Sequence, residues 1–281
     1  MGRVENVAVF NDTAKLCREN EVIKEALKAS VLGQKLIREG TSLPAEKIQK
    51  EKYADKAQII VSKKKSFETA AGYRKEKVCV LNFASATNPG GGVELGASAQ
   101  EECLCRCSGL YFALNTEEMW EGFYAPHRRE RNPLHNDDII YTPDILVFKS
   151  DYAIQELLPK QEWYQVNVIT CAAPNLRGNP SNRYNSGDGN QAVKITEEEL
   201  FALHVKRFTA ILDVAAAEGN EVVILGAFGC GAFANSPNVV ARAAKQVIAN
   251  YMHCFKTIEF AVYSSSWDAP NYRIFDEVLG L

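Results

Sequence analysis

Short, uninterrupted runs of apolar residues alternate with longer amphipathic stretches along this chain. The apolar runs predict strands at residues 58–62, 78–82, 144–148, 166–170, 221–225 and 257–263. The amphipathic stretches predict helices at residues 66–74, 98–114, 196–217, 237–252 and 272–279. Because strands that are apolar on both faces alternate with helices, we expect an α/β fold whose sheet is covered by helices on both faces.

The first 50 or so residues have a helical pattern. Asn11-Asp12-Thr13 is a plausible helix cap, followed by periodic apolar residues as far as Leu32. Gly33 and Gly40 interrupt this pattern, and a short helix at residues 45–50 is expected after Pro44. We therefore expect one domain, with a helical extension over residues 1–55 and an α/β core over residues 56–281.

Two stretches, residues 120–141 and 175–191, have no clear period and are rich in Pro, Gly, Asn and Arg. They are predicted to be loops. Loops of this length are uncommon in compact domains and often cover functional sites. An ordered excursion over the surface is the alternative.

Charge and composition exclude several classes of protein. The net charge of −3 gives no basic excess for binding bulk DNA or RNA. No apolar run approaches the roughly 20 residues that span a bilayer, so no membrane association is expected. Without a signal-peptide pattern, a cytoplasmic location is expected, with the 8 cysteines as reduced thiols.

The first candidate for chemistry is the loop after the predicted strand at 78–82. It contains Asn88 and the triplet Gly90, Gly91 and Gly92. Ligands bind at the carboxyl ends of strands in open α/β sheets, and bare glycine backbone can approach a ligand closely. The Asn88 amide can donate hydrogen bonds to sugar hydroxyls and also accept hydrogen bonds from them. Alone, such a triplet is equally typical of a flexible turn.

Gln100-Glu101-Glu102 follows the triplet after seven residues, in the first turns of a predicted helix. Adjacent side chains on a helix point about 100° apart, so one carboxylate can orient a ligand while the other transfers a proton. A second negative group nearby raises a carboxyl pKa, which suits an acid catalyst at a glycosidic bond. Acids at a helix start are otherwise usually partners of the helix dipole.

A second glycine-rich loop follows the predicted strand at 221–225 and leads into a helix. Its centre is Gly229-Cys230-Gly231-Ala232-Phe233. Bare amides before a helix form an anion cradle that suits a diphosphate. The loop is neither a Walker loop, since no Lys-Ser/Thr follows, nor a good dinucleotide fingerprint.

Two cysteine features allow other readings. Cys103, Cys105 and Cys107 are spaced two apart, so they face away from one another on a helix and suit zinc poorly. We expect buried core side chains and no metal. Cys230 could be a nucleophile, but no histidine pattern around it supports that role.

Together these motifs are far more specific. The glycine triplet, seven residues and Gln100-Glu101-Glu102 resemble the signature of poly(ADP-ribose) glycohydrolases. Asn82 and Asn88-Pro89 before the triplet, and Thr170-Cys-Ala-Ala-Pro-Asn175, are similar to the microbial branch of that family, as is the loop around Phe233. The resemblance covers nearly the whole chain.

The resemblance implies a macrodomain-like mixed sheet flanked by helices, without a cofactor. It implies that Glu102 is the catalytic acid/base and that Glu101 binds ribose hydroxyls. Asn88 and the triplet would hold the terminal ribose, beside Gln100. Residues 229–233 would wrap the diphosphate, with Phe233 against the ribose.

The activity implied is hydrolysis of ribose–ribose bonds in poly(ADP-ribose), which releases ADP-ribose. ADP-ribosylated proteins would be partners, as carriers of the polymer. A hydrolase of mono-ADP-ribosylated proteins or acyl-ADP-ribose, and a reader that binds without cleaving, remain alternatives. A second carboxylate beside a diphosphate site argues against the reader.

Overall fold

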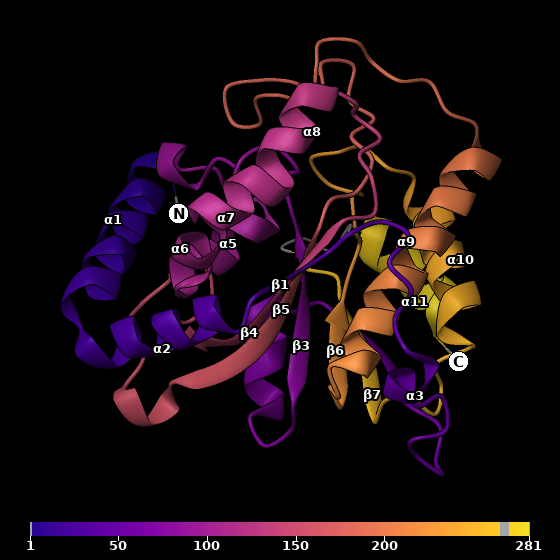
Figure 1. The fold of residues 1–281 in the computed structure, drawn as a ribbon, viewed down its shortest axis with the longest axis horizontal. Coiled ribbons are helices and arrows are strands. Elements are labelled where there is room, and N and C mark those ends of the chain that lie inside the picture. The colour runs from indigo at the N-terminus through magenta and orange to yellow at the C-terminus, as the bar shows by residue number, and fades with distance from the viewer. Residues whose placement is uncertain (1, 265–269, 281) are drawn as a thin grey trace.

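A seven-stranded sheet forms the centre of the molecule, and helices lie on both sides of it (Figure 1). The computed structural model describes residues 2–264 and 270–280. The strand order is β1-β4-β5-β3-β6-β7-β2, with β4 antiparallel to both of its neighbours and the other pairs parallel. The predicted mixed α/β architecture is confirmed.

The strands are β1 (Lys35–Ile37), β2 (Gln58–Ser62), β3 (Val78–Phe83), β4 (Ile139–Val147), β5 (Tyr164–Cys171), β6 (Val222–Leu225) and β7 (Thr257–Ala261). The α-helices are α1 (Arg3–Glu19), α2 (Glu21–Leu32), α3 (Ala45–Ile48), α4 (Ser66–Ala70), α5 (Gln100–Cys107), α6 (Leu110–Leu114), α7 (Glu117–Met119), α8 (Ala125–Glu130), α9 (Glu197–Ala217), α10 (Pro237–Ile248) and α11 (Pro270–Leu279). Each of the six strands expected from the apolar runs is present.

The sheet has a hydrophobic core on each face because its buried strands are apolar throughout. In β3, Cys79 and Leu81 belong to the core under α9, α10 and α11. Val78 and Val80 belong to the opposite core, which α5 and α6 cover. Alternate side chains of a strand point to opposite faces, so a run without polar residues requires cover on both sides.

The expected cap at residues 11–13 is wrong. These residues lie inside α1, and the chain breaks instead at Asn20. The Asn20 side chain accepts hydrogen bonds from the backbone N–H groups of Val22 and Ile23, which caps α2. Thr13 is instead buried and donates to the Arg106 carbonyl, 2.5 Å away.

Two further predictions about elements need correction. The helix expected at 98–114 is divided into α5 and α6, and Ser108 between them accepts from the Leu110 N–H and donates to the Leu104 carbonyl. The loop expected at 120–141 contains a π-helix (Trp120–Tyr124), α8 and the start of β4. Phe123, Tyr124 and His127 of this segment are buried. Its helical pieces are too short to give a regular amphipathic period in the sequence.

The N-terminal segment also contributes a strand that the sequence pattern did not reveal. β1 is three residues long and pairs with β4 at the edge of the sheet. So short a strand gives no alternation to detect. A boundary between extension and core at residue 55 stays a prediction.

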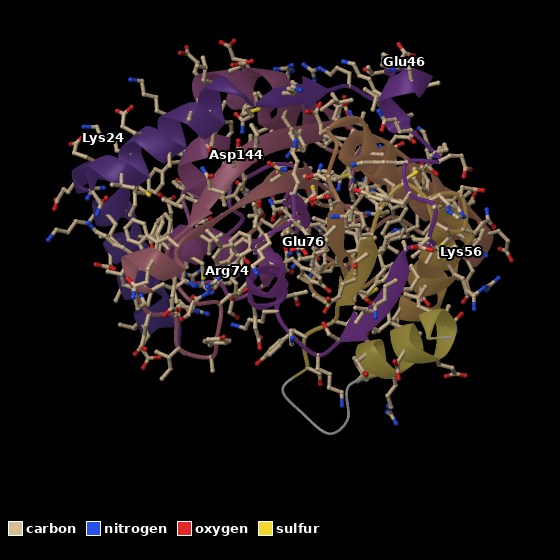
Figure 2. All side chains as sticks on the ribbon, turned by 90° about the horizontal axis from the view of Figure 1, so that it is seen from below. Lys24, Glu46, Lys56, Arg74, Glu76 and Asp144 are labelled. Atoms are coloured by element: carbon tan, nitrogen blue, oxygen red, sulfur yellow. The ribbon has the colours of Figure 1, made fainter. Side chains whose placement is uncertain are left out.

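The two ends of the sheet differ in character. Figure 2 views the molecule from below, where charged residues such as Lys56, Arg74 and Glu76 precede β2 and β3. The long loops lie at the opposite end, at the top of Figure 1. No helix within residues 2–264 and 270–280 is long and apolar enough to cross a membrane.

Candidate active site

The first glycine loop (residues 83–92) leaves the carboxyl end of β3 and folds back over the start of α5. Gly90 and Gly91 have φ angles of 67° and 59°, in the left-handed region that favours glycine. A Cβ atom on Gly91 would lie 2.5 Å from Glu102 Oε1 and 3.1 Å from Glu101 Oε2. Gly91 therefore permits the close approach of backbone and carboxylates.

Glu101 is held firmly by β3 and the loop after it. Its Oε1 accepts from Asn82 Nδ2 at 3.2 Å, and its Oε2 accepts from the Ser85 N–H at 2.8 Å. Only 3% of the residue is exposed. Such fixed donors suit a group that orients a ligand.

Glu102 is arranged differently. Its Oε1 accepts from the Gly92 N–H at 2.9 Å, whereas Oε2 is buried and has no hydrogen-bond partner among the described residues. The residue lines a cavity of about 890 Å³. An unpartnered carboxyl oxygen is costly to bury unless it is protonated or meets a ligand.

Burial raises the pKa of both carboxyl groups. For Glu101, burial and then the neighbouring charge of Glu102 raise the pKa to about 8. For Glu102, burial raises the pKa, although the Gly92 N–H and Arg106 oppose the shift. Two coupled acids titrate as a pair, so the site retains a proton above the ordinary carboxyl range.

Gln100 connects α5 to β3. Its Oε1 accepts from the Phe83 N–H at 2.9 Å, and its Nε2 donates to the Leu81 carbonyl at 2.7 Å and to Ser66 Oγ at 2.9 Å. These three hydrogen bonds of the Gln100 side-chain amide are all made to other groups of the protein. Gln100 fixes the start of α5, and therefore the two glutamates after it.

The second glycine loop (residues 226–235) joins β6 to α10. Gly229 has a φ of 78°, and a Cβ there would lie 2.7 Å from the Ala173 side chain. Asn235 Nδ2 holds the loop closed by donating to the carbonyls of Pro174, Gly229 and Phe233. Around Gly231 there is no atom within 4 Å of an added Cβ, so its backbone is open to a ligand.

The cavity brings most of the expected site residues together. It extends from the glutamate pair over the second glycine loop towards Tyr263, after β7. Of the expected residues, it is lined by Gly91, Gln100, Glu101, Glu102, Gly229, Gly231, Ala232 and Phe233. Gly90, Gly92, Asn88 and Cys230 belong to the same two loops but do not line it.

Asn88 has a different setting from the one expected. Its Oδ1 accepts from Arg128 Nη1 and Ser186 Oγ, each at 3.0 Å, and its Nδ2 donates to the Ser186 carbonyl at 3.0 Å. These contacts link the first glycine loop to α8 and to residue 186. The side chain is thus engaged by the protein.

The stretch at 175–191, here the cover loop, lies irregularly over the site as expected. Its Asn182, Tyr184 and Asn185 line the cavity, as does Arg177. Sequence reasoning did not single out these residues. Two features of the sequence point to them: the composition of the loop, and Asn175, the last residue of the motif that follows β5.

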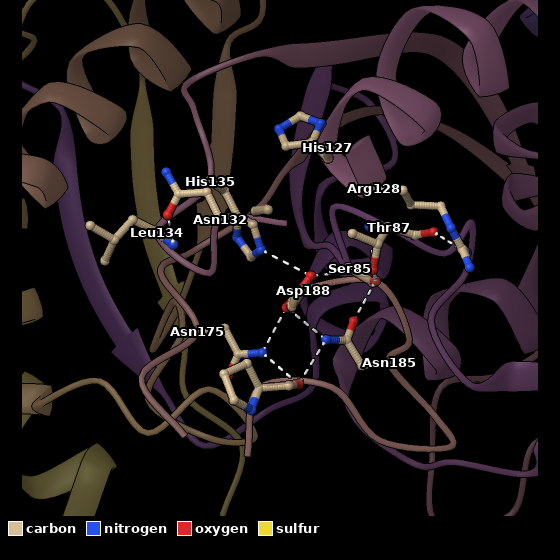
Figure 3. Close-up of polar contacts among 12 residues, drawn as sticks. Ser85, Thr87, His127, Arg128, Asn132, Leu134, His135, Asn175, Asn185 and Asp188 are labelled. Atoms are coloured by element: carbon tan, nitrogen blue, oxygen red, sulfur yellow. Dashed lines mark hydrogen bonds and ion pairs between the residues drawn. The ribbon is translucent and has the colours of Figure 1, made fainter. Parts of the chain in front are cut away.

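Asp188 anchors the cover loop (Figure 3). It is 1% exposed, and its Oδ2 accepts from Asn175 Nδ2 at 2.7 Å and Asn185 Nδ2 at 2.8 Å. Its Oδ1 accepts from Thr87 Oγ1 at 3.3 Å and lies 3.2 Å from His135 Nε2. Burial alone would raise the pKa of Asp188, but these donors lower it, so the carboxylate is charged.

This network reaches the glutamates through one further side chain. Asn185 Oδ1 accepts from Ser85 Oγ at 2.6 Å, and the Ser85 N–H donates to Glu101. Asp188, Asn185 and Ser85 therefore form a continuous path from the cover loop to Glu101. Figure 3 shows these three residues in sequence.

The three clustered cysteines differ in exposure. Cys105 and Cys107 are buried and Cys103 is partly buried, and all three thiols are free. Burial raises the pKa of each. Within residues 2–264 and 270–280, no group of three or more His, Cys, Asp or Glu side chains could hold a metal ion.

The family is decided by a comparison with family models. Residues 5–150 match the catalytic domain of microbial-type poly(ADP-ribose) glycohydrolase (PARG). The chain belongs to the microbial-type PARG family. The Gln100-Glu101-Glu102 motif on α5 and the glycine triplet of the first glycine loop lie inside the matched residues.

Solved PARG structures have the same fold as this microbial-type PARG chain. Poly(ADP-ribose) glycohydrolase from Thermomonospora curvata shares 28% identity with a TM-score of 0.81, over 98% of this chain and 100% of that chain. The structure of its complex with the inhibitor ADP-HPD shares 30% identity with a TM-score of 0.79, over 98% of this chain and 99% of that chain. The Deinococcus radiodurans enzyme in complex with ADP-ribose shares 30% identity with a TM-score of 0.74, over 90% of this chain and 96% of that chain. Among curated proteins, no match was found.

Proposed function

We propose that this chain hydrolyses ribose–ribose O-glycosidic bonds of poly(ADP-ribose) and releases ADP-ribose. One observation carries the proposal: the buried Glu102 carboxyl has one oxygen held by the Gly92 N–H and the other unpartnered, at the wall of the cavity. The related T. curvata and D. radiodurans proteins are poly(ADP-ribose) glycohydrolases, with ADP-HPD or ADP-ribose bound. Their activity supports the same assignment here.

In this proposal Glu102 is first an acid and then a base. Its proton passes to the ribose 2′-oxygen of the leaving unit as the bond from that oxygen to the anomeric carbon breaks. The resulting carboxylate then takes a proton from water, whose oxygen bonds to the oxocarbenium-like carbon. The raised pKa of Glu102 supports the acid role, because it keeps the proton on at higher pH.

Glu101 binds hydroxyls of the terminal ribose in this proposal. Both of its oxygens already accept one bond from the protein. With a pKa of about 8 the carboxyl is largely protonated at neutral pH, so it can also donate one hydrogen bond to a hydroxyl and accept another. The Gly90–Gly92 backbone lies against the same sugar. Because Asn88 is engaged by Arg128 and Ser186, its contribution is to hold this loop in shape.

The second glycine loop binds the diphosphate. Gly231 presents an open backbone in the loop before α10, and N–H groups in such a loop attract anions. The Phe233 ring packs against the terminal ribose. Arg177, whose guanidinium lies 5.6 Å from the centre of that ring, adds positive charge at the same wall.

The adenine end of the ligand lies towards Tyr263. This side chain is 53% exposed, lies two residues after the end of β7, and lines the cavity. An exposed aromatic ring offers a stacking face for a base. Carrier proteins of the polymer would remain outside the cavity, and the 8 free cysteines suit a reducing, cytoplasmic setting.

The decisive experiment compares the wild type with Glu102→Gln on purified poly(ADP-ribose). We expect the wild type to release ADP-ribose and the variant to lose turnover by at least about 10²–10⁴-fold, since no proton can be transferred. ADP-ribose affinity, measured by calorimetry, should stay close to that of the wild type. Glu118→Gln, on the exposed surface of α7, is the matched control and should remain active.

Other outcomes would choose between the alternatives. Normal turnover by Glu102→Gln would remove Glu102 from the acid role. Release of ADP-ribose only from a mono-ADP-ribosylated protein would indicate the second hydrolase activity. Tight binding of ADP-ribose by a wild type that cleaves neither substrate would indicate a reader.

A further inference from the structure

The cavity is not confined to the glutamates and the second glycine loop. It is also lined by Arg3 and Asn6 of α1, by Ala97, and by Tyr184 of the cover loop. Asn6 Nδ2 donates to the Gly96 carbonyl at 3.0 Å, which binds α1 to the wall. The first turn of α1 is therefore part of the mouth of the site.

Tyr184 is close to the reacting groups. A Cβ added to Gly92 would lie 2.9 Å from Tyr184 Cβ, and the Gly92 N–H is the group that holds Glu102. The Tyr184 ring is thus one residue away from the carboxyl that would protonate the leaving oxygen. In the proposed function the terminal ADP-ribose extends from Glu102 to the second glycine loop, so a leaving group next to Glu102 would lie close to this ring.

Two arginines converge on the Tyr184 ring. The Arg3 guanidinium carbon lies 5.3 Å and that of Arg183 lies 5.1 Å from its centre. Neither arginine has an ion pair within the described part of the chain. Two like charges at one ring repel each other, and a bound anion would relieve that repulsion.

We propose that Arg3, Tyr184 and Arg183 form a subsite for the ADP-ribose unit on the leaving side of the scissile bond. The arginines would bind its pyrophosphate, since guanidinium groups pair well with phosphate oxygens, and the Tyr184 ring would contact its adenosine. This inference rests on the proposed function and identifies which part of the polymer the enzyme recognises beyond the terminal unit.

The subsite explains how a chain of net charge −3 can attract a polyanion to one place. Unpaired arginines beside the glutamates supply local positive charge that the overall composition hides. Their contribution should act on polymer and not on free ADP-ribose, because ADP-ribose has no leaving unit. Affinity for ADP-ribose alone would then be independent of them.

The test is the double variant Arg3→Ala/Arg183→Ala with two substrates. One is poly(ADP-ribose); the other is ADP-ribose linked to adenosine alone, so that the leaving group has no phosphate. We expect kcat/KM on polymer to fall about three- to tenfold, as for the loss of two exposed charge contacts, and to depend less on salt. The phosphate-free substrate should be cleaved as by the wild type.

Arg18→Ala/Lys28→Ala is the matched control. It removes the same charge from exposed positions of α1 and α2, and residue 18 lies roughly 22 Å along α1 from residue 3 at 1.5 Å per residue. This variant should match the wild type on both substrates. Equal losses on the two substrates by the arginine double variant, or no loss on either, would overturn the subsite.

Binding separates this inference from the proposed function. In a Glu102→Gln background, fluorescence anisotropy should show that removing both arginines weakens a labelled two-unit oligomer and leaves labelled ADP-ribose unchanged. If the wild type cleaves nothing, the proposed hydrolase is wrong, yet the anisotropy still tests the subsite. Equal affinity of both proteins for the two-unit oligomer would contradict it.

Discussion

At the scale of single residues, the two adjacent glutamates have different environments. Both oxygens of Glu101 have protein donors, whereas one oxygen of Glu102 has none. The helix sends the two side chains in different directions, and the backbone of β3 and of the first glycine loop meets each one separately. This difference is the physical basis for giving them different roles.

The burial of Glu101 predicts how the stability of the folded protein depends on pH. Its folded pKa of about 8 lies above the ordinary glutamate value of 4.5, so the folded state keeps a proton that the unfolded state loses. The stability from this group is complete below pH 4.5 and is lost as pH rises towards 8. We expect Glu101→Gln to gain in melting temperature relative to the wild type over this window.

The gain should level off above pH 8, where both states of the wild type have lost the proton. Calorimetric melting at closely spaced pH values measures it. Glu118→Gln, at an exposed position, should show no such trend. A constant difference between Glu101→Gln and the wild type at every pH would show that Glu101 is not protonated in the folded protein.

The residues of the site were predictable where a motif specified them. Gly91 of the glycine triplet and Gln100-Glu101-Glu102 do meet at one cavity, although the roles given to them remain proposals. Asn88 was assigned from its amide chemistry and from the family resemblance, and its partners Arg128 and Ser186 come from segments about 40 and 98 residues away. Local sequence does not contain such contacts.

At the scale of elements, the cover loop depends on one buried charge. Asp188 accepts hydrogen bonds from Asn175 and Asn185 of the loop and from Thr87 of the first glycine loop. Replacing it by Ala leaves the buried amides of Asn175 and Asn185 with fewer acceptors. Each unsatisfied buried group typically costs about 1–3 kcal/mol.

We therefore expect Asp188→Ala to weaken ADP-ribose binding as well as to lower kcat on polymer, because Asn185 both lines the cavity and orients Ser85. Asp188→Glu, which keeps the charge, should restore part of both. Kinetics on poly(ADP-ribose) with calorimetry of ADP-ribose give the two values separately.

Asn220→Ala is the control for this variant. Asn220 is buried and hydrogen-bonded to Asn167 and to the Ala215 carbonyl, at the other end of the sheet. It should lower the melting temperature without changing kcat or ADP-ribose affinity. The positioning role fails if Asp188→Ala affects only the melting temperature, as this control does.

Elements with a strong local signal were predicted closely, and others were not. β2 begins and ends at Gln58 and Ser62 as expected, and α9 begins after Thr196, whose hydroxyl accepts from the Glu199 N–H. β1 and the helices within residues 120–130 were missed. They are short, and tertiary packing rather than periodicity forms them.

At the scale of the whole molecule, a single arginine connects α9 to both sides of the site. Arg207 is 0% exposed; its Nε donates to Asp137 Oδ1 at 2.8 Å, and its Nη atoms donate to the carbonyls of Ala172, Leu134 and His135. These carbonyls belong to the segments that precede β4 and follow β5. Arg207 thereby also supports the His135 that faces Asp188.

Removing this guanidinium should destabilise the entire fold. We expect Arg207→Met to lower the free energy of unfolding by about 3–5 kcal/mol, because four hydrogen bonds of the buried guanidinium are lost and Asp137 keeps only the exposed Lys206, 2.7 Å from its Oδ2. Urea denaturation measures the loss. Adding Asp137→Asn should recover part of it, and recovery of nothing would show that the carbonyl contacts, rather than the ion pair, carry the effect.

The position of α1 has a practical consequence. Its first turn forms one lip of the opening, with Arg3 and Asn6 in the wall, whereas α11 lies across the molecule, near the other terminus (Figure 1). An affinity tag fused ahead of α1 would crowd the path of a long polymer while leaving room for a free nucleotide-sugar. Purification handles therefore belong after α11, and a preparation tagged at the front would give misleadingly low rates on polymer.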